Sequence, residues 1–230
     1  MATWAKELYG FYKYLEPPGN LPDSIKWLYP QQDEKLMGIV QQFFQKFYND
    51  TEPRTLLLGI NPGRFGGGVT GVNFTATKQL QENCGIVSNL KFQSELSADF
   101  IYEMISQYGG VNSFYRTFFI GSVCPLGFIK NGKNINYYDD KELAKTVEPF
   151  IIKSLEQLLK FRFKKDRCFC IGGEKNFRYL SKLNDQYTWF EKVIPLPHPR
   201  FIMQYRRKQL QKYIDQYLMV LGMARLERQF

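Results

Sequence analysis

The loop that begins at Asn61 contains the first side chain that could do chemistry. Asn61 follows a short apolar run, and glycine is frequent in the ten residues after it. An asparagine amide can orient a water molecule through its carbonyl oxygen, and glycines allow a base and sugar to approach the backbone closely. The alternative is a structural turn without a chemical role, because Asn-Pro-Gly is a common turn sequence.

Two phosphate-binding motifs can be compared with the same loop. Gly66, Gly68 and Gly71 match a G-x-G-x-x-G dinucleotide pattern, but Pro62 separates the apolar run from the glycines, and residues 72–75 do not open a helix. No Gly-Lys-Ser/Thr follows, so a Walker lysine is missing. A nucleotide-phosphate enzyme stays a minor alternative, and it predicts nucleotide-dependent stabilisation of the fold.

His198 is the single histidine of the chain and lies between Pro197 and Pro199, directly after an apolar run. A lone histidine is usually structural, but this one precedes the densest basic cluster of the sequence. The cluster includes Arg200, Arg206, Arg207, Lys208 and Lys212. Positive charge therefore gathers beside a candidate site, although a solvated basic helix face explains the same charges.

Alternating strands and helices must position these residues. Compact apolar runs predict strands over residues 54–60, 116–120, 167–171 and 190–196, and helical periodicity predicts helices over 33–48, 97–107, 140–161, 174–183 and 205–221. The pattern predicts an α/β fold, a three-layer α/β/α sandwich with a central parallel sheet of about four strands. Asn61 and His198 then lie at the carboxyl edge of the sheet, where such folds bind ligands.

Length and composition suit one globular domain. The chain has 230 residues, of which 44% are hydrophobic and 23% charged, and no linker separates two halves. We therefore expect a single domain over residues 1–230, with residues 1–50 a helical part packed on it. No apolar stretch is long enough to span a bilayer, and the N-terminus does not resemble a secretory signal, so we expect an intracellular, cytoplasmic protein, nucleoid-associated if bacterial. We also expect a monomer.

The charge and the cysteines limit the partners. Thirty-one Lys+Arg against 22 Asp+Glu leave a formal net charge of +9, which attracts phosphate backbones. Four cysteines contain no Cys-x-x-Cys pair, and one histidine cannot complete a usual zinc site. We expect buried or free thiols, no metal and no cofactor.

Several motifs occur in order along the chain. They are Gly59-Ile60-Asn61-Pro62-Gly63-Arg64-Phe65-Gly66, Thr70-Gly71-Val72-Asn73-Phe74, Phe119-Ile120-Gly121-Ser122-Val123-Cys124-Pro125-Leu126, Gly132-Lys133-Asn134, Ile171-Gly172-Gly173 and His198-Pro199. Taken together, they resemble the single-strand-selective monofunctional uracil-DNA glycosylases of the uracil-DNA glycosylase superfamily. Each motif is short, but their joint occurrence at compatible spacing is specific. The resemblance extends from about Thr55 to the C-terminal helix.

The resemblance implies a mechanism without a metal. Asn61 would hold the attacking water, and His198 would donate a hydrogen bond to the uracil oxygen on which negative charge develops. Phe74 would stack on the flipped-out base. The backbone of Gly63, Arg64 and Phe65 would line the base pocket.

One departure from the family pattern concerns base recognition. The family commonly places an asparagine that reads the uracil edge where this chain has Ser122, a hydroxyl that makes fewer simultaneous contacts. A pocket that also accepts other deaminated or oxidised bases is therefore expected.

A second departure follows His198. The residues Phe201, Ile202 and Met203 are expected to wedge into the gap left by the flipped nucleotide, while Arg200 and Arg206, with Arg207 and Lys208 beside them, bind phosphates. The alternative is that the apolar residues pack the last helix onto the sheet.

These observations predict a monofunctional DNA glycosylase of base excision repair whose partner is DNA containing uracil or a related damaged base. The rival interpretation is a nucleic-acid-binding protein of the same fold with weak or no catalysis, which Ser122 favours. Release of free base distinguishes the two.

Overall fold

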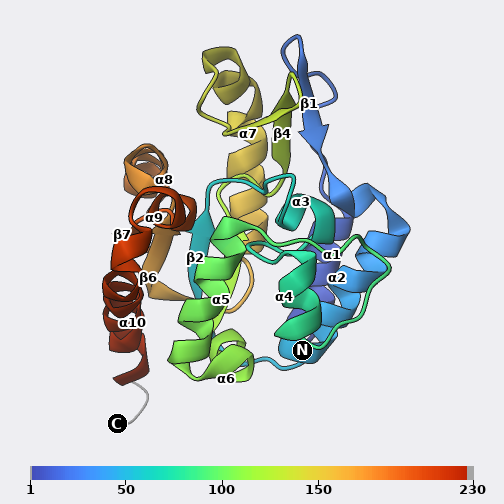
Figure 1. Ribbon diagram of the computed structural model, residues 1–230. Coiled ribbons are helices and arrows are strands. Elements are labelled where there is room, and N and C mark those ends of the chain that lie inside the picture. The colour runs from blue at the N-terminus through green and yellow to red at the C-terminus, as the bar shows by residue number, and fades with distance from the viewer. Residues whose placement is uncertain (1, 227–230) are drawn as a thin grey trace.

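The computed structural model describes residues 2–226 and contains a four-stranded parallel sheet (Figure 1). Its strands are β2 (Arg54–Gly59), β3 (Phe118–Ser122), β6 (Phe163–Ile171) and β7 (Val193–Leu196), in the order β3-β2-β6-β7. Every residue of β2 is buried, as expected for a central strand covered on both faces. The predicted α/β fold with four parallel strands is confirmed.

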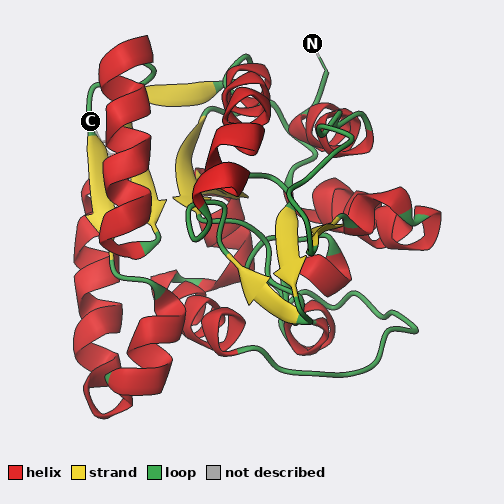
Figure 2. Cartoon of the chain, turned by 90° about the horizontal axis from the view of Figure 1, so that it is seen from above, coloured by secondary structure: helices red, strands yellow, loops and turns green. Residues whose placement is uncertain are grey.

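Helices cover both faces of this sheet, which gives the three layers (Figure 2). Phe118 of β3 packs against Tyr108 of α5 (Leu96–Tyr108), with ring centroids 5.5 Å apart. Gly121, three residues further on, faces Leu158 of α7 (Lys141–Leu158). Side chains alternate along a strand, so α5 and α7 lie on opposite faces. The helix α10 (Leu210–Leu226) joins the α5 layer through Tyr217, and α8 (Gly173–Tyr187) connects β6 to β7.

The N-terminal helices flank the edge strand β3. The helices α1 (Trp4–Lys13) and α2 (Glu34–Phe47) stack Tyr12 on Phe44 with ring centroids 5.9 Å apart, and Tyr48 contacts Phe119 of β3 at 5.6 Å. Asp33 caps α2 by accepting a hydrogen bond from the backbone of Lys35. This end of the chain is therefore tied to the sheet by aromatic packing.

A small antiparallel sheet is an element that the sequence analysis did not predict. It consists of β1 (Ile25–Leu28), β4 (Gly127–Lys130) and β5 (Lys133–Ile135), in the order β1-β4-β5. Asn131 and Gly132 join β4 to β5 with positive φ angles of 50° and 72°, as a two-residue hairpin turn requires. The small sheet lies next to the carboxyl ends of the parallel strands (Figure 1).

Several predicted boundaries differ from the structure. The strand expected over 190–196 begins at Val193, and the strand expected over 167–171 begins at Phe163. The strand expected from Arg116 begins at Phe118, because α6 (Gly110–Thr117) occupies the preceding residues. The helix expected over 205–221 begins only at Leu210, as α10, and the residues before it form α9 (Pro199–Tyr205) and the 3₁₀ turn η2 (Arg207–Gln209). Pro199 begins α9 because proline suits the first position of a helix, and His198 caps it.

The remaining short elements are η1 (Pro30–Gln32), α3 (Gly67–Thr70) and α4 (Thr77–Glu82). Between residues 2 and 226, no helix has the length and apolar character needed to cross a membrane.

Candidate active site

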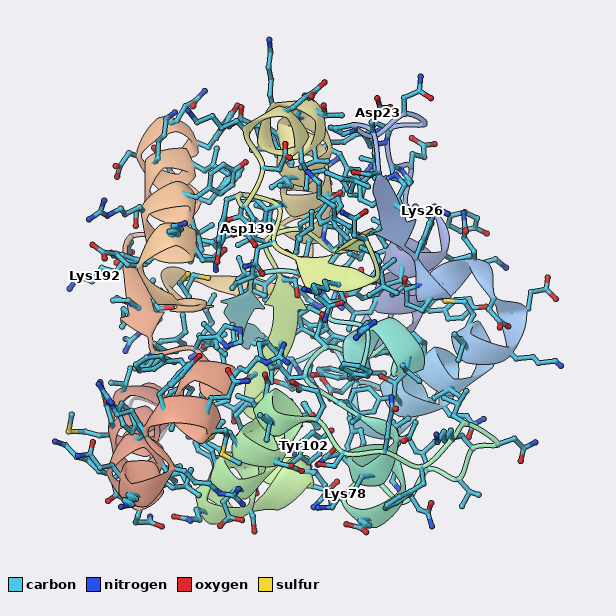
Figure 3. The ribbon with its side chains drawn as sticks, turned by 45° about the horizontal axis from the view of Figure 1, so that its top comes forward. Asp23, Lys26, Lys78, Tyr102, Asp139 and Lys192 are labelled. Atoms are coloured by element: carbon cyan, nitrogen blue, oxygen red, sulfur yellow. The ribbon has the colours of Figure 1, made fainter. Side chains whose placement is uncertain are left out.

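A cavity of about 400 Å³ opens at the carboxyl edge of the parallel sheet. Its walls come from the loop after β2, from the last residue of β3, from β5 and the residues after it, from the start of α5 and from α9. In Figure 3, Tyr102 of α5 and Asp139, between β5 and α7, lie on opposite sides of the centre of the view. Eight predicted site residues line the cavity: Asn61, Gly63, Phe65, Phe74, Ser122, His198, Arg200 and Phe201.

The amide of Asn61 is fixed by backbone groups alone. Its Oδ1 accepts a hydrogen bond from the backbone N–H of Tyr137 at 3.1 Å, and its Nδ2 donates to the carbonyl oxygens of Ile135 at 3.3 Å and Pro62 at 3.4 Å. A carbonyl oxygen has two lone pairs, so Oδ1 keeps one for a further donor such as water. The hairpin β4–β5 thus aims the amide at the cavity.

The imidazole of His198 has one nitrogen engaged and one free to donate. Its Nδ1 accepts the backbone N–H of Arg200 at 3.1 Å, which caps α9. Enclosure of the ring, followed by the positive charge of Arg200, lowers the pKa of His198 to about 4. At neutral pH the ring is therefore uncharged, and because Nδ1 is an acceptor, the proton resides on Nε2.

Phe74 supplies the aromatic wall of the cavity. It has a positive φ of 52°, and its ring lies so close to Gly59 that a Cβ on that glycine would stand 2.6 Å from Cε2 of the ring. The rings of Phe74 and His198 are 6.3 Å apart at an interplanar angle of 47°. The two rings form adjacent walls of one space.

Ser122 is buried at the end of β3, and its hydroxyl donates a hydrogen bond to Oδ1 of Asn73 at 2.9 Å. Asn73 also lines the cavity, but the sequence analysis gave it no role. The Thr70–Phe74 motif contains Asn73, and nothing in the sequence signals its contact with Ser122.

The prediction that Arg64 lines the base pocket is corrected. It is absent from the residues that line the cavity; its backbone N–H donates to Oδ1 of Asn134 at 3.1 Å, and its guanidinium binds the carbonyl oxygen of Gly132. The guanidinium carbon also lies 4.5 Å from the ring centre of Phe65. Arg64 therefore ties the glycine loop to the β4–β5 hairpin, and Asn134, which the sequence analysis did not single out as a site residue, lines the cavity instead.

The predicted wedge is corrected in part. Phe201 is 44% exposed at the mouth of the cavity, but Ile202 is 0% exposed, because it lies on the inner face of α9. The prediction that Ile202 inserts into DNA is therefore wrong for this structure, and Met203 is only partly exposed and packs against the core. Tyr205, which the sequence analysis did not select, is 67% exposed, and its ring centre is 5.6 Å from that of Phe201.

Exposed basic side chains lie on α9, which lines the cavity, and on the residues that follow it. Arg200 lines the cavity, and Arg206 places its guanidinium 5.5 Å from the ring centre of Phe201. Arg207 and Lys208 follow on η2 and are exposed. Arg200 therefore lies on the cavity wall and Arg206 beside a residue that lines it.

The four cysteines are buried, as predicted, and burial raises the pKa of the Cys124 thiol to about 12, which keeps it protonated. Within residues 2–226, no group of three or more histidine, cysteine, aspartate or glutamate side chains could hold a metal ion.

Comparison with known proteins agrees with the fold. A family model of the uracil DNA glycosylase superfamily matches residues 45–222, and the chain belongs to this superfamily. More particularly, it is similar to the crystal structure of wild-type SMUG2 from Pedobacter heparinus, with 45% sequence identity, a TM-score of 0.93, and 97% of this chain and 98% of that chain covered. No curated protein matches the sequence. The resemblance drawn from the sequence is confirmed, and the chain is a glycosylase-type hydrolase.

Proposed function

We propose that this protein hydrolyses the N-glycosidic bond of uracil in DNA, as a monofunctional glycosylase of base excision repair. The observation that carries the proposal is the convergence of Asn61 and His198 on one cavity at the carboxyl edge of the sheet. The first offers an acceptor for a water molecule, and the second offers a neutral N–H donor.

Two partial charges need stabilisation when the bond between C1′ and N1 breaks. Its electron pair leaves with the base, so the sugar becomes oxocarbenium-like and uracil departs as an anion. The Nε2–H of His198 donates a hydrogen bond to the uracil oxygen that gains charge, an interaction that strengthens as the bond breaks. A neutral imidazole suits this role because it stabilises the anion without transferring its proton.

Water completes the hydrolysis. Oδ1 of Asn61 orients a water molecule whose oxygen bonds to C1′, and the proton that this water loses is released to solvent or to the departing base. An amide is a weak base, so this arrangement suits a reaction in which the leaving group has largely departed before the water attacks. Binding and charge stabilisation then supply most of the rate enhancement.

The rest of the cavity suits a flipped-out base. Phe74 offers a stacking surface, and the backbone at Gly63 and Phe65 forms a wall without a bulky side chain at the glycine. Ser122 presents a single hydroxyl, which supports a base range that includes other deaminated bases. We also propose that the protein acts as a monomer.

DNA binding follows from the charges and rings at the mouth. Arg200, Arg206, Arg207 and Lys208 are exposed and can bind phosphates, while Phe201 and Tyr205 are exposed rings able to fill the gap left by a flipped nucleotide. Together these residues make uracil-containing DNA the expected partner.

The test uses single- and double-stranded oligonucleotides with one uracil, hypoxanthine or xanthine. Alkali-labile sites are scored for the wild type and for Asn61→Ala and His198→Ala, and DNA binding is measured in parallel. Uracil release that falls by about 100-fold or more in each variant, with DNA binding retained, supports the proposal. DNA binding without release of any of the bases would contradict it and favour a non-catalytic binding protein.

A further inference from the structure

Three buried side chains connect helix α1 to the cavity. Nδ2 of Asn73 donates a hydrogen bond to the hydroxyl of Tyr12 at 3.0 Å, and the hydroxyl of Ser122 donates to Oδ1 of Asn73 at 2.9 Å. The exposed fractions of Tyr12, Asn73 and Ser122 are 2%, 8% and 6%. Asn73 and Ser122 line the cavity, whereas Tyr12 lies outside the residues that line it.

The backbone determines which way the amide of Asn73 points. Nδ2 also donates to the carbonyl oxygen of Ile120 at 3.4 Å. A backbone carbonyl can only accept, so the amide nitrogen must face Ile120, and Oδ1 must face Ser122. The hydroxyl of Tyr12, on α1, accepts a hydrogen bond from the same nitrogen. Burial raises the pKa of Tyr12, so this phenol stays protonated.

This orientation decides what Ser122 can offer a base. A serine hydroxyl has one proton, and here that proton is committed to Asn73. The cavity therefore meets only the lone pairs of the Ser122 oxygen. A ring N–H can bond to these lone pairs, whereas a ring nitrogen with its own lone pair is left unsatisfied and repelled.

Deamination changes this ring position. Uracil has an N–H at ring position 3, where cytosine has a lone pair, and hypoxanthine differs from adenine in the same way at position 1. We propose that Tyr12 and Asn73 are positioning residues that hold the Ser122 hydroxyl as an acceptor, so that the cavity selects the deaminated base over its normal parent. This inference rests on the proposed base-excision function, and it assigns a role to α1, which lies outside the family match over residues 45–222.

The test measures binding separately from catalysis. Single-stranded oligonucleotides carry one 2′-fluoro-arabino nucleotide of uracil or cytosine, because the fluorine slows breakage of the glycosidic bond and leaves the base intact. The readout is the ratio of the two dissociation constants, cytosine over uracil. It is measured for the wild type, Ser122→Ala, Asn73→Leu and Tyr12→Phe, and thermal denaturation checks that each variant folds.

The wild type is expected to prefer the uracil probe. Ser122→Ala and Asn73→Leu should lower the ratio by about tenfold, and Tyr12→Phe by about threefold, since Asn73 keeps its bond to Ile120. The matched control is Tyr29→Phe, which removes a hydroxyl that donates to the carbonyl oxygen of Leu15 at 3.0 Å, away from the cavity. This control should leave the ratio unchanged.

A purely structural role gives a different result, because the variants would then lower the melting temperature or weaken both probes equally without changing the ratio. That outcome overturns the proposal. If Asn73→Leu does not fold, the ratios of Ser122→Ala and Tyr12→Phe still test the proposal.

Release of uracil from ordinary deoxyuridine separates this proposal from the proposed function. Release by the wild type with an unchanged ratio in the variants refutes the positioning role alone. A ratio that falls in the variants without any base release supports the positioning role and refutes the catalysis. Absence of both release and preference refutes both.

Discussion

Nδ1 of His198 accepts the backbone N–H of Arg200 at 3.1 Å, so one histidine both caps helix α9 and fixes its own tautomer. Protonation of Nδ1 would break this bond and place a second positive charge beside Arg200. Burial of the ring disfavours the charged imidazole most, and the positive charge of Arg200 adds to this effect, so the pKa of His198 falls from 6.5 to about 4. Two measurable consequences follow, one for activity and one for stability.

Activity is expected to persist well below the usual pKa of histidine. Base release should stay near its neutral value down to about pH 5 and decline near pH 4, where His198 becomes charged. The measurement is kcat/KM for uracil release between pH 4 and 8, corrected for loss without enzyme. An acid limb near 6.5 would contradict the assignment of a neutral, enclosed imidazole.

Stability has the matching pH dependence. Since the folded pKa lies below the unfolded value of 6.5, the unfolded chain binds the proton first, and the free energy of unfolding falls as pH drops from 6.5 toward 4. The contribution of His198 is fully present above 6.5. Denaturant titrations of the wild type and of His198→Gln should show a smaller decrease over this range in the variant.

A methyl group at Gly59 is expected to disturb the base-stacking wall. In Gly59→Ala the new Cβ would stand 2.6 Å from Cε2 of Phe74, so the ring must move. We expect about 1–3 kcal/mol of destabilisation and a raised KM for uracil DNA. Gly38→Ala is the control, because its Cβ meets no atom within 4 Å in helix α2, and it should leave KM unchanged. Equal KM values in the two variants would contradict the stacking role of Phe74.

The exposed rings of α9 should matter more for duplex than for single-stranded DNA. Phe201→Ala and Tyr205→Ala remove side chains that are 44% and 67% exposed beside the cavity, so a flipped nucleotide in a duplex loses the group that fills its gap. We expect base release from duplex DNA to fall about tenfold, because unstacking a nucleotide from a duplex costs a few kcal/mol. Release from single strands should fall much less. Tyr14→Ala, at a ring 72% exposed on the chain after α1, is the control. Equal losses on both substrates would count against the wedge.

A buried arginine should contribute strongly to stability. Arg54 is 0% exposed, donates to both carboxylate oxygens of Asp50 at 2.8 and 2.7 Å, and donates to the carbonyl oxygen of Tyr115 at 2.7 Å. A lysine has neither this planar geometry nor the same number of donors, so Arg54→Lys should cost about 2–4 kcal/mol by chemical denaturation. The control Arg178→Lys changes an exposed pair with Glu174 and should cost less than about 0.5 kcal/mol. Similar costs for the two variants would refute the role assigned to the buried arginine.

The parallel sheet was predictable because its strands are continuous apolar runs, and residues 54–60 are the clearest case. The small sheet was missed because its strands are three or four residues long and alternate weakly. One signal was present: Asn131-Gly132 is a typical hairpin turn. The sequence Pro197-His198-Pro199 likewise contained the start of α9, since proline favours the first helical position.

The residues of the candidate site that belong to a sequence motif were predictable. Contacts that depend only on the tertiary fold were not. Asn61 and His198 stand directly after strands, so topology alone brings them to one edge. The contact between Tyr12 and Asn73 joins α1 to a distant loop, and no local pattern encodes such a contact. The burial of Ile202 depends on the rotation of α9, which a seven-residue helix does not reveal by its periodicity.

The partners of Asn61 also influence how this site tolerates mutation. All three of its hydrogen bonds go to main-chain groups, of Pro62, Ile135 and Tyr137. Replacing the partly exposed side chain of Ile135 leaves its carbonyl oxygen in place. Substitutions at this position should therefore not change the geometry of the Asn61 amide. Proline at position 137 is the exception, because it lacks the N–H that Oδ1 accepts. The amide of Asn61 is thus coupled to the path of the hairpin, so we expect the candidate site to tolerate side-chain substitutions in the hairpin better than changes in its length.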